Sequence, residues 1–183
     1  TEAEGPGRRA ALWVQGCPIR CEGCFNPETW SFDGGTERTV GEWLDSIRAA
    51  GDIEGVSFLG GEPFAHAAPL AALGRLCREA GLSVVTFSGY SRQRIESSPR
   101  PDWRALLDVT DLLLAGPFVQ ARLDLSRPWV GSANQEFVFL TERYRDLQPR
   151  LCALPNQLEV RVGQRGEVAW NGLAPQAELD ALH

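Results

Sequence analysis

Residues 17–24 read CPIRCEGC, which places three cysteines, Cys17, Cys21 and Cys24, in one short loop. Three thiols at this spacing cannot all point from one face of a helix or a strand, so the segment is expected to wrap around a common centre. The neighbouring glycines and prolines favour the tight turns that such a wrap requires; they are Gly16, Pro18, Gly23 and Pro27. The segment is therefore a candidate binding loop.

Three uses of these cysteines fit the spacing. A structural zinc site commonly has four ligands in two separated cysteine pairs, and no fourth cysteine lies near this loop. An iron–sulfur cluster held by three cysteines would keep one iron open for an outside ligand. The third use is a disulfide or a purely structural role, although the odd total of five cysteines fits a reducing compartment better than a disulfide framework. The spacing favours the iron–sulfur cluster, with zinc second.

Outside this loop, short apolar segments alternate with segments of helical periodicity. We expect strands at residues 10–14, 56–59, 83–87, 112–115 and 137–140. Thr39 and Glu42 form a capping box that starts a helix ending at Gly51, and further helices are expected at residues 69–80 and 103–109. Residues 158–162 and 167–170 read as a β-hairpin, and the polar, alanine-rich residues from 175 onward read as a frayed helix.

The alternation of strands and helices predicts an α/β fold built from parallel βαβ units. Four or five units are too few to close an eightfold barrel, which leaves an incomplete, crescent-shaped barrel or an open doubly wound sheet. Both architectures place the working site at the carboxyl ends of the strands. The cysteine loop follows the first strand, and residues 60–63 (GGEP), 88–90 (SGY) and 116–118 (GPF) follow the next three. We therefore expect these four segments to meet in one site.

The composition is that of one globular domain. The chain has 183 residues, 43% of them hydrophobic, and its 18 basic and 24 acidic residues give a formal net charge of −6. We expect a single domain over residues 1–183, with a core at about residues 10–141 and a C-terminal hairpin and tail at about residues 155–183. The acidic balance argues against a nucleic-acid partner, and no apolar run is long enough to cross a membrane.

The cysteine loop and its continuation, residues 17–30 (CPIRCEGCFNPETW), resemble the cluster loop of the radical S-adenosylmethionine (SAM) superfamily. The closest resemblance is to the enzymes that activate anaerobic ribonucleotide reductase. It covers about residues 10–141 and continues, in the family's order, through residues 60–63, 87–90 (FSGY), 114–118 (LAGPF) and 129–135 (WVGSANQ).

This resemblance implies a fold and a set of ligands. The fold would be an incomplete (βα) radical-SAM barrel, with a parallel sheet and the helices on its outside. Cys17, Cys21 and Cys24 would ligate a [4Fe–4S] cluster, whose open iron would bind SAM. The residues that would contact this cofactor are Gly23, Cys24, Phe25, Gly60, Gly61, Glu62, Pro63, Ser88 and Tyr90. Within this set the paired glycines would allow a close backbone approach, and Ser88 and Tyr90 would line the wall opposite the adenosine.

The implied activity is reductive cleavage of SAM to a 5′-deoxyadenosyl radical that abstracts hydrogen from a glycine of a large partner enzyme. Flavodoxin or ferredoxin would supply the electron, because no Gly-x-Gly-x-x-Gly motif for a flavin or nicotinamide occurs at a strand-to-helix turn. An oxygen-sensitive cluster implies the reducing cytoplasm.

Two alternatives stay open. Ala115, Val130 and Glu136 depart from the pattern of the activating enzymes, which would suit a radical SAM enzyme that modifies a peptide or a small molecule in a biosynthetic pathway. The second alternative is a zinc-stabilised interaction domain without catalysis.

The remaining candidate residues have structural readings. Cys77 lies on an apolar helix face and reads as a buried structural thiol, and Cys152 has no identifiable partner and reads as inert. His66 is expected to cap or pack near the second strand's loop. Asn134 and Gln135 are expected to cap backbone groups.

Overall fold

The computed structural model describes residues 1–174; the helix expected from residue 175 onward lies outside the described residues. The strands are β1 (Arg9–Val14), β2 (Gly55–Gly60), β3 (Ser83–Ser88), β4 (Leu112–Ala115), β5 (Glu136–Phe139), β6 (Leu158–Val162) and β7 (Val168–Gly172). The α-helices are α1 (Val40–Ala49), α2 (Ala67–Glu79), α3 (Arg92–Glu96) and α4 (Pro101–Val109). Four 3-10 helices complete the chain: η1 (Pro27–Thr29), η2 (Pro63–His66), η3 (Gln120–Arg122) and η4 (Glu142–Ala153). No helix within residues 1–174 has the length and apolar character that a membrane crossing requires.

The central sheet has the strand order β1-β2-β3-β4-β5, so neighbours in the sheet are also neighbours in the sequence. β1 to β4 run parallel, whereas β5 is antiparallel to β4. The expectation of a further parallel strand at residues 137–140 is therefore wrong. A parallel return needs a crossover that carries the chain to the other end of the sheet. The connection here holds only the short η3, and Ala115 pairs directly with Glu136, so the chain leaves and re-enters the sheet at the same end.

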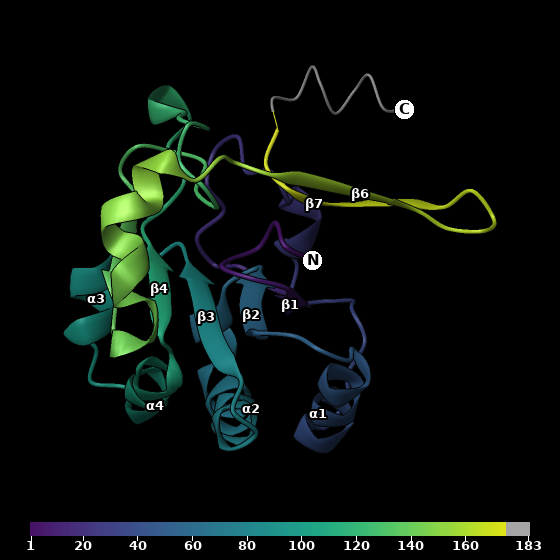
Figure 1. The fold of residues 1–183 in the computed structure, drawn as a ribbon. Helices are drawn as coiled ribbons and strands as arrows, with labels where there is room; N and C mark the ends of the chain where they lie inside the picture. The colour runs from purple at the N-terminus through teal and green to yellow at the C-terminus, as the bar shows by residue number, and fades with distance from the viewer. Residues whose placement is uncertain (175–183) are drawn as a thin grey trace.

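The helices gather on one face of this sheet. Figure 1 shows α1, α2 and α4 side by side along one side of the strands. Their apolar side chains share the main buried cluster with Val56, Phe58, Val84 and Leu113 of the sheet. A smaller cluster covers part of the other face, where Val85, Leu112 and Leu114 pack with Tyr144 of η4. The α/β class with a mainly parallel sheet is confirmed, and the sequential strand order lacks the reversal that defines a doubly wound sheet.

Local sequence signals located most of these elements. The backbone N–H of Glu42 donates to Thr39 Oγ1 (3.3 Å) and the Glu42 carboxylate accepts from the Thr39 N–H (2.7 Å), so the expected capping box of α1 is confirmed. The first four strands, the helices at α2 and α4, and the β6–β7 hairpin also agree with expectation within a few residues. α3 and η4 were not expected; Pro149 inside η4 lacks the backbone donor that a regular α-helix would use.

A buried arginine closes the amino end of the parallel strands. Arg9 is 2% exposed, and its guanidinium donates to Ser57 Oγ (2.8 Å), Ser83 Oγ (3.0 Å), Tyr144 Oη (2.9 Å) and the Val56 carbonyl (2.7 Å). A guanidinium carries five N–H donors, so this many acceptors can satisfy it without water. The network ties β1, β2, β3 and η4 together at the end of the sheet opposite the cysteine loop.

Candidate functional site

A pocket opens at the carboxyl ends of the parallel strands, on the face that the helices leave free. Its floor is one row of side chains across four strands: Trp13, Leu59, Phe87 and Leu114. Trp13 pairs with Leu59, and Phe87 pairs with Leu114. Because side chains alternate between the two faces of a sheet, a row of paired residues projects to one side. The floor is therefore apolar and continuous.

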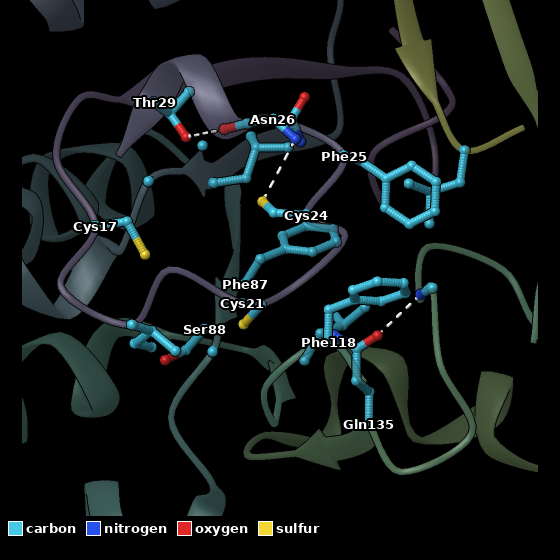
Figure 2. A pocket seen from close by; sticks show the side chains of 18 of the residues that line it. Cys17, Cys21, Cys24, Phe25, Asn26, Thr29, Phe87, Ser88, Phe118 and Gln135 are labelled. Atoms are coloured by element: carbon cyan, nitrogen blue, oxygen red, sulfur yellow. Dashed lines mark hydrogen bonds between the residues drawn. The ribbon is translucent and has the colours of Figure 1, made fainter. Parts of the chain in front are cut away.

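The three cysteines of the loop surround this pocket. Cys17, Cys21 and Cys24 all line it, and Figure 2 shows their thiols around an open space above Phe87. Cys17 is buried, whereas the other two are half-buried. The N–H groups of Gly16 and Cys17 donate to the carbonyls of residues 29 and 30, at 2.8 and 3.1 Å, so the loop closes on itself behind the thiols.

Backbone groups position the second and third thiols. The Cys24 N–H donates to the Cys21 carbonyl (3.2 Å), and the Asn26 N–H donates to Cys24 Sγ (3.4 Å). Burial raises the pKa of the Cys21 thiol, a backbone N–H of Phe118 lowers it, and the nearby thiols of Cys24 and Cys17 raise it further. Cys24 and Cys17 thus both lie near enough to Cys21 to affect its thiol. A positively charged metal centre would favour the thiolate form of all three.

The donor set fits a cluster better than a single ion. Within residues 1–174, no three His, Cys, Asp or Glu side chains converge closely enough to hold one metal ion. A cluster of several irons offers a separate coordination position to each cysteine, so thiols spread around a cavity suit it. A closed structural zinc site needs four ligands on one ion. The Trp30 indole N–H, buried at the pocket wall without a partner among the described residues, is one donor that a ligand could meet.

The paired glycines at the end of β2 are fixed against the root of the cysteine loop. The Gly61 N–H donates to the Val14 carbonyl (2.7 Å) and the Glu62 N–H donates to the Gly16 carbonyl (2.9 Å). Gly60 has a φ of +103°, and a Cβ on it would lie 2.6 Å from the Val14 nitrogen. A Cβ on Gly61 would overlap the Gly16 carbonyl oxygen. Only glycine permits this approach, which brings both glycines to the pocket lining.

Glu62 is turned away from the pocket lining and braces the next strand end. Its side chain is fully buried, and its carboxylate accepts from the Phe64 N–H, the Ser88 hydroxyl and the Gly89 N–H, each at 2.9 Å. Burial raises the pKa of Glu62 to about 7, against the opposing effect of these three donors. The residue therefore holds the Ser88–Gly89 turn against the end of β2, and Ser88 and Gly89 line the pocket.

The structure gathers some of the expected cofactor residues and not others. Those that line the pocket are Cys17, Cys21, Cys24, Phe25, Gly60, Gly61 and Ser88. Gly23 is exposed beside the Gln120 side chain, and Pro63 is buried at the start of η2. The ring of Tyr90 stacks on Trp103 with centroids 4.8 Å apart, and Arg94 covers it at 4.9 Å. Contact of any of these residues with a cofactor stays a prediction.

The wall opposite the cysteine loop comes from the connection between β4 and β5. Phe118 packs edge-on against Phe25 with ring centroids 5.1 Å apart, which Figure 2 also shows. The amide oxygen of Gln135 accepts from the Gly131 N–H (2.9 Å) and the Ser132 N–H (3.0 Å). The reading of Gln135 as a backbone cap is confirmed, and Asn134 likewise donates to the Pro117 carbonyl at 2.7 Å. This capping fixes the turn that carries the wall.

Two further lining residues had no expected role. Trp129 lies in the left-handed region with a φ of +63°, which is rare for a bulky residue and marks a constrained turn. Glu4 is 6% exposed, and its carboxylate accepts from the Gly172 N–H at 2.7 Å; burial raises its pKa to about 7. Trp129 opens the 129–135 segment that resembles the family, but no contact was assigned to it, and Glu4 lies outside every motif.

The remaining candidates lie outside the pocket. Cys77 is fully buried in the core, and burial raises the pKa of its thiol to about 11, which keeps it neutral as expected for a structural residue. Cys152 is exposed. His66 Nε2 lies 2.6 Å from the Gln15 carbonyl, which agrees with a packing role beside the loop. Ala115 and Val130 are each 1% exposed, so these departures from the family pattern lie in the core.

Comparisons with known proteins cover most of the described chain. Residues 3–138 match the model of a family described as a 4Fe-4S single cluster domain. An anaerobic ribonucleoside-triphosphate reductase-activating protein of Vibrio cholerae is 35% identical over 143 residues, which span 72% of this chain and 87% of that protein. A protein of the same description from Salmonella typhimurium is 33% identical over 142 residues, 72% of this chain and 88% of that protein. A pyruvate formate-lyase-activating enzyme of Clostridium pasteurianum is 34% identical over 115 residues, 58% of this chain and 47% of that enzyme.

Proposed function

The chain belongs to the 4Fe-4S single cluster domain family, and we propose that it is a radical SAM enzyme of the type that activates glycyl-radical enzymes. The observation that carries this proposal is the gathering of Cys17, Cys21 and Cys24 around one pocket, beside Gly60 and Gly61, at the carboxyl ends of parallel strands. When bound there, a [4Fe–4S] cluster would supply the electron that cleaves SAM to methionine and a 5′-deoxyadenosyl radical.

The residues of this chain orient the ligands and exclude water. The three thiols would hold the cluster, and with three cysteine ligands one iron would keep a coordination position for an outside ligand. The N–H of Asn26 stabilises negative charge on Cys24 Sγ. Gly60 and Gly61 line the pocket without side chains of their own, so their backbone atoms would be available to the amino and carboxylate groups of SAM. The apolar floor keeps water from a reactive radical.

The partner follows from the names of the relatives. The relatives from Vibrio cholerae and Salmonella typhimurium are described as activating proteins of anaerobic ribonucleoside-triphosphate reductase, and the relative from Clostridium pasteurianum as a pyruvate formate-lyase-activating enzyme. We infer that this chain abstracts a hydrogen atom from a glycine of a large partner enzyme. Ala115 and Val130 lie in the core and not at the pocket, so neither favours a small-molecule substrate.

Three further proposals rest on the same chemistry. A flavodoxin or ferredoxin serves as the external electron donor, and the reducing cytoplasm is the compartment that would preserve an oxygen-sensitive cluster. The sheet is proposed to be an incomplete radical-SAM barrel, and the parallel pairing of β1 to β4 with helices packed on one face supports this. We also propose that the described residues, 1–174, form one domain around this sheet.

Anaerobic reconstitution tests the proposal. With iron and sulfide the chain should gain a broad absorbance at about 400 nm and about four irons, and with dithionite and SAM it should form 5′-deoxyadenosine. Incubation with an anaerobic ribonucleotide reductase from the same genome should then give a glycyl-radical doublet in electron paramagnetic resonance. A colourless protein that retains zinc would instead support a zinc-stabilised interaction domain. A cluster and SAM cleavage with no protein radical would support modification of a peptide or small molecule.

A further inference from the structure

The β6–β7 hairpin extends from the body of the molecule instead of packing into it. Figure 1 shows the two strands running outward from the side of the sheet opposite α1, α2 and α4. Val160 pairs with Trp170 and Val162 pairs with Val168, so these side chains lie on one face of the ribbon. The other face carries Glu159, Arg161, Ala169 and Asn171. The hairpin is thus amphipathic although it forms no part of the core.

Three valines on the apolar side of this ribbon are exposed to solvent. The exposed fractions of Val160, Val162 and Val168 are 42%, 71% and 45%. Within residues 1–174, β6 and β7 pack extensively only on each other. Valine is a favourable strand residue, but an exposed apolar cluster on a projecting ribbon commonly marks an interaction surface. We call Val160, Val162 and Val168 the hairpin face.

The base of the hairpin is part of the pocket rim. Gly172, the last residue of β7, and Leu173 both line the pocket. The Gly172 N–H donates to the carboxylate of Glu4 (2.7 Å), and the Glu2 N–H donates to the carboxylate of Glu159 (3.0 Å). These bonds join both strands to the N-terminal segment. The ribbon that carries the hairpin face therefore begins at the pocket lining.

The length of the hairpin indicates which kind of molecule could contact the hairpin face. Five strand residues span about 16 Å, so Val162 lies well beyond the reach of a small substrate held over the cysteine loop. A large protein that inserts one segment into the pocket would lie along the hairpin with its neighbouring surface. A second copy of this chain on the same face would place another body at the opening and obstruct such a protein.

We propose that the hairpin face is a docking surface for the protein substrate itself, through an apolar patch beside the segment that enters the pocket. This inference rests on the proposed function and names where the partner enzyme binds. Burial of three valines adds affinity for the intact protein and does nothing for the chemistry in the pocket. It also explains why the valines lie on the ribbon that begins at the rim.

The test compares substitutions on the two faces of the hairpin. The double variant Val162→Glu/Val168→Glu places charge on the hairpin face, and Ala169→Glu places charge on the polar face of the same ribbon. With an anaerobic ribonucleotide reductase from the same genome as the probe, the double variant should raise the KM for the reductase about tenfold or more, measured as glycyl radical formed. Ala169→Glu should leave this KM within about twofold. Formation of 5′-deoxyadenosine without the reductase should be unchanged in both.

Each other result overturns the docking proposal. An unchanged KM for the reductase in the double variant would contradict the docking proposal. It would leave the proposed function intact, because SAM cleavage is measured separately. A dimer by light scattering that the double variant converts to a monomer would assign the face to a second copy. A melting temperature lowered by several degrees in the double variant, but not in Ala169→Glu, would show that this chain itself covers the face. Absence of SAM cleavage in the wild-type chain would contradict the proposed function and the docking proposal together.

Discussion

The two ends of the parallel strands are built on opposite principles. At the amino end, Arg9 is buried. Its guanidinium nitrogens donate to oxygens of serine, tyrosine and the backbone. At the carboxyl end, three thiols and a buried indole N–H without a partner among the described residues line an open pocket. The difference shows that this sheet concentrates satisfied polar contacts at one end and leaves unsatisfied ligands at the other, which separates stability from function.

The largest expected effect is the loss of activity on removal of a thiol at the carboxyl end. Cys21→Ala should lose the absorbance at about 400 nm and reduce SAM cleavage by at least about a thousandfold, because two cysteines cannot retain the cluster. The free energy of unfolding of the metal-free protein should change by less than about 1 kcal/mol, since Cys21 is only half-buried. Cys152→Ala, at an exposed site away from the pocket, is the matched control. SAM cleavage at the wild-type rate in Cys21→Ala would refute the assignment.

The reverse pattern is expected at the amino end. Arg9→Met removes the donors from several buried oxygens, including Ser83 Oγ and Tyr144 Oη, and should lower the free energy of unfolding by about 3 kcal/mol in urea. Activity per folded molecule should stay near that of the wild type. Arg104→Met, which breaks only an exposed ion pair with Asp108, should cost less than about 0.5 kcal/mol. Equal losses in the two variants would show that the buried network adds no stability.

Gly61→Ala should have an intermediate effect, and it should lower both the stability of the chain and its affinity for SAM. A Cβ at this position would overlap the Gly16 carbonyl, so the root of the cysteine loop must shift. We expect a loss of about 2 kcal/mol in stability and a weaker affinity for SAM in the reconstituted enzyme. Gly41→Ala is the control, because Gly41 lies on the exposed side of α1 with open space around it and alanine should stabilise the helix by about 0.5 to 1 kcal/mol. Unaltered SAM affinity in Gly61→Ala would contradict the inference that the close contact between Gly61 and Gly16 shapes the SAM site.

The last prediction concerns the dependence of stability on pH. The pKa of Glu4 is raised from 4.5 to about 7 by burial, so the folded chain binds a proton that the unfolded chain releases within this range. The free energy of unfolding should therefore fall as pH rises from about 4.5 to about 7, and level off above. Glu4→Gln keeps an oxygen for the Gly172 N–H and should flatten this slope, leaving the part due to Glu62. Urea denaturation between pH 5 and pH 8 measures the slope, and an unchanged slope in Glu4→Gln would contradict the raised pKa.

The sequence predicted the elements whose signals are local. The capping box at Thr39, the apolar runs of β1 to β4 and the hairpin all depend on residues within a few positions of one another. The direction of β5 was wrong, because its apolar run cannot reveal that residues 116–135 lack a crossover helix. α3 and η4 were not expected, since α3 has only five residues and the polar η4 contains Pro149.

The site divides in the same way. The spacing of Cys17, Cys21 and Cys24 and the pair Gly60-Gly61 identified the loop and the strand end that meet at the pocket. The orientation of Glu62 and Tyr90 was beyond the sequence, because the first is drawn inward by three donors and the second by the ring of Trp103.

The sequence by itself determined the cysteine loop, the paired glycines and the order of strands and helices, because each is encoded by residue type and short-range spacing. Only the tertiary structure decided that Glu4, Trp129 and Gly172 reach the same pocket, and that the valines of the hairpin remain exposed beside it. These outcomes depend on contacts between segments more than a hundred residues apart, such as the bond from Gly172 to Glu4. No local preference encodes such a contact, since it exists only after the whole sheet has assembled.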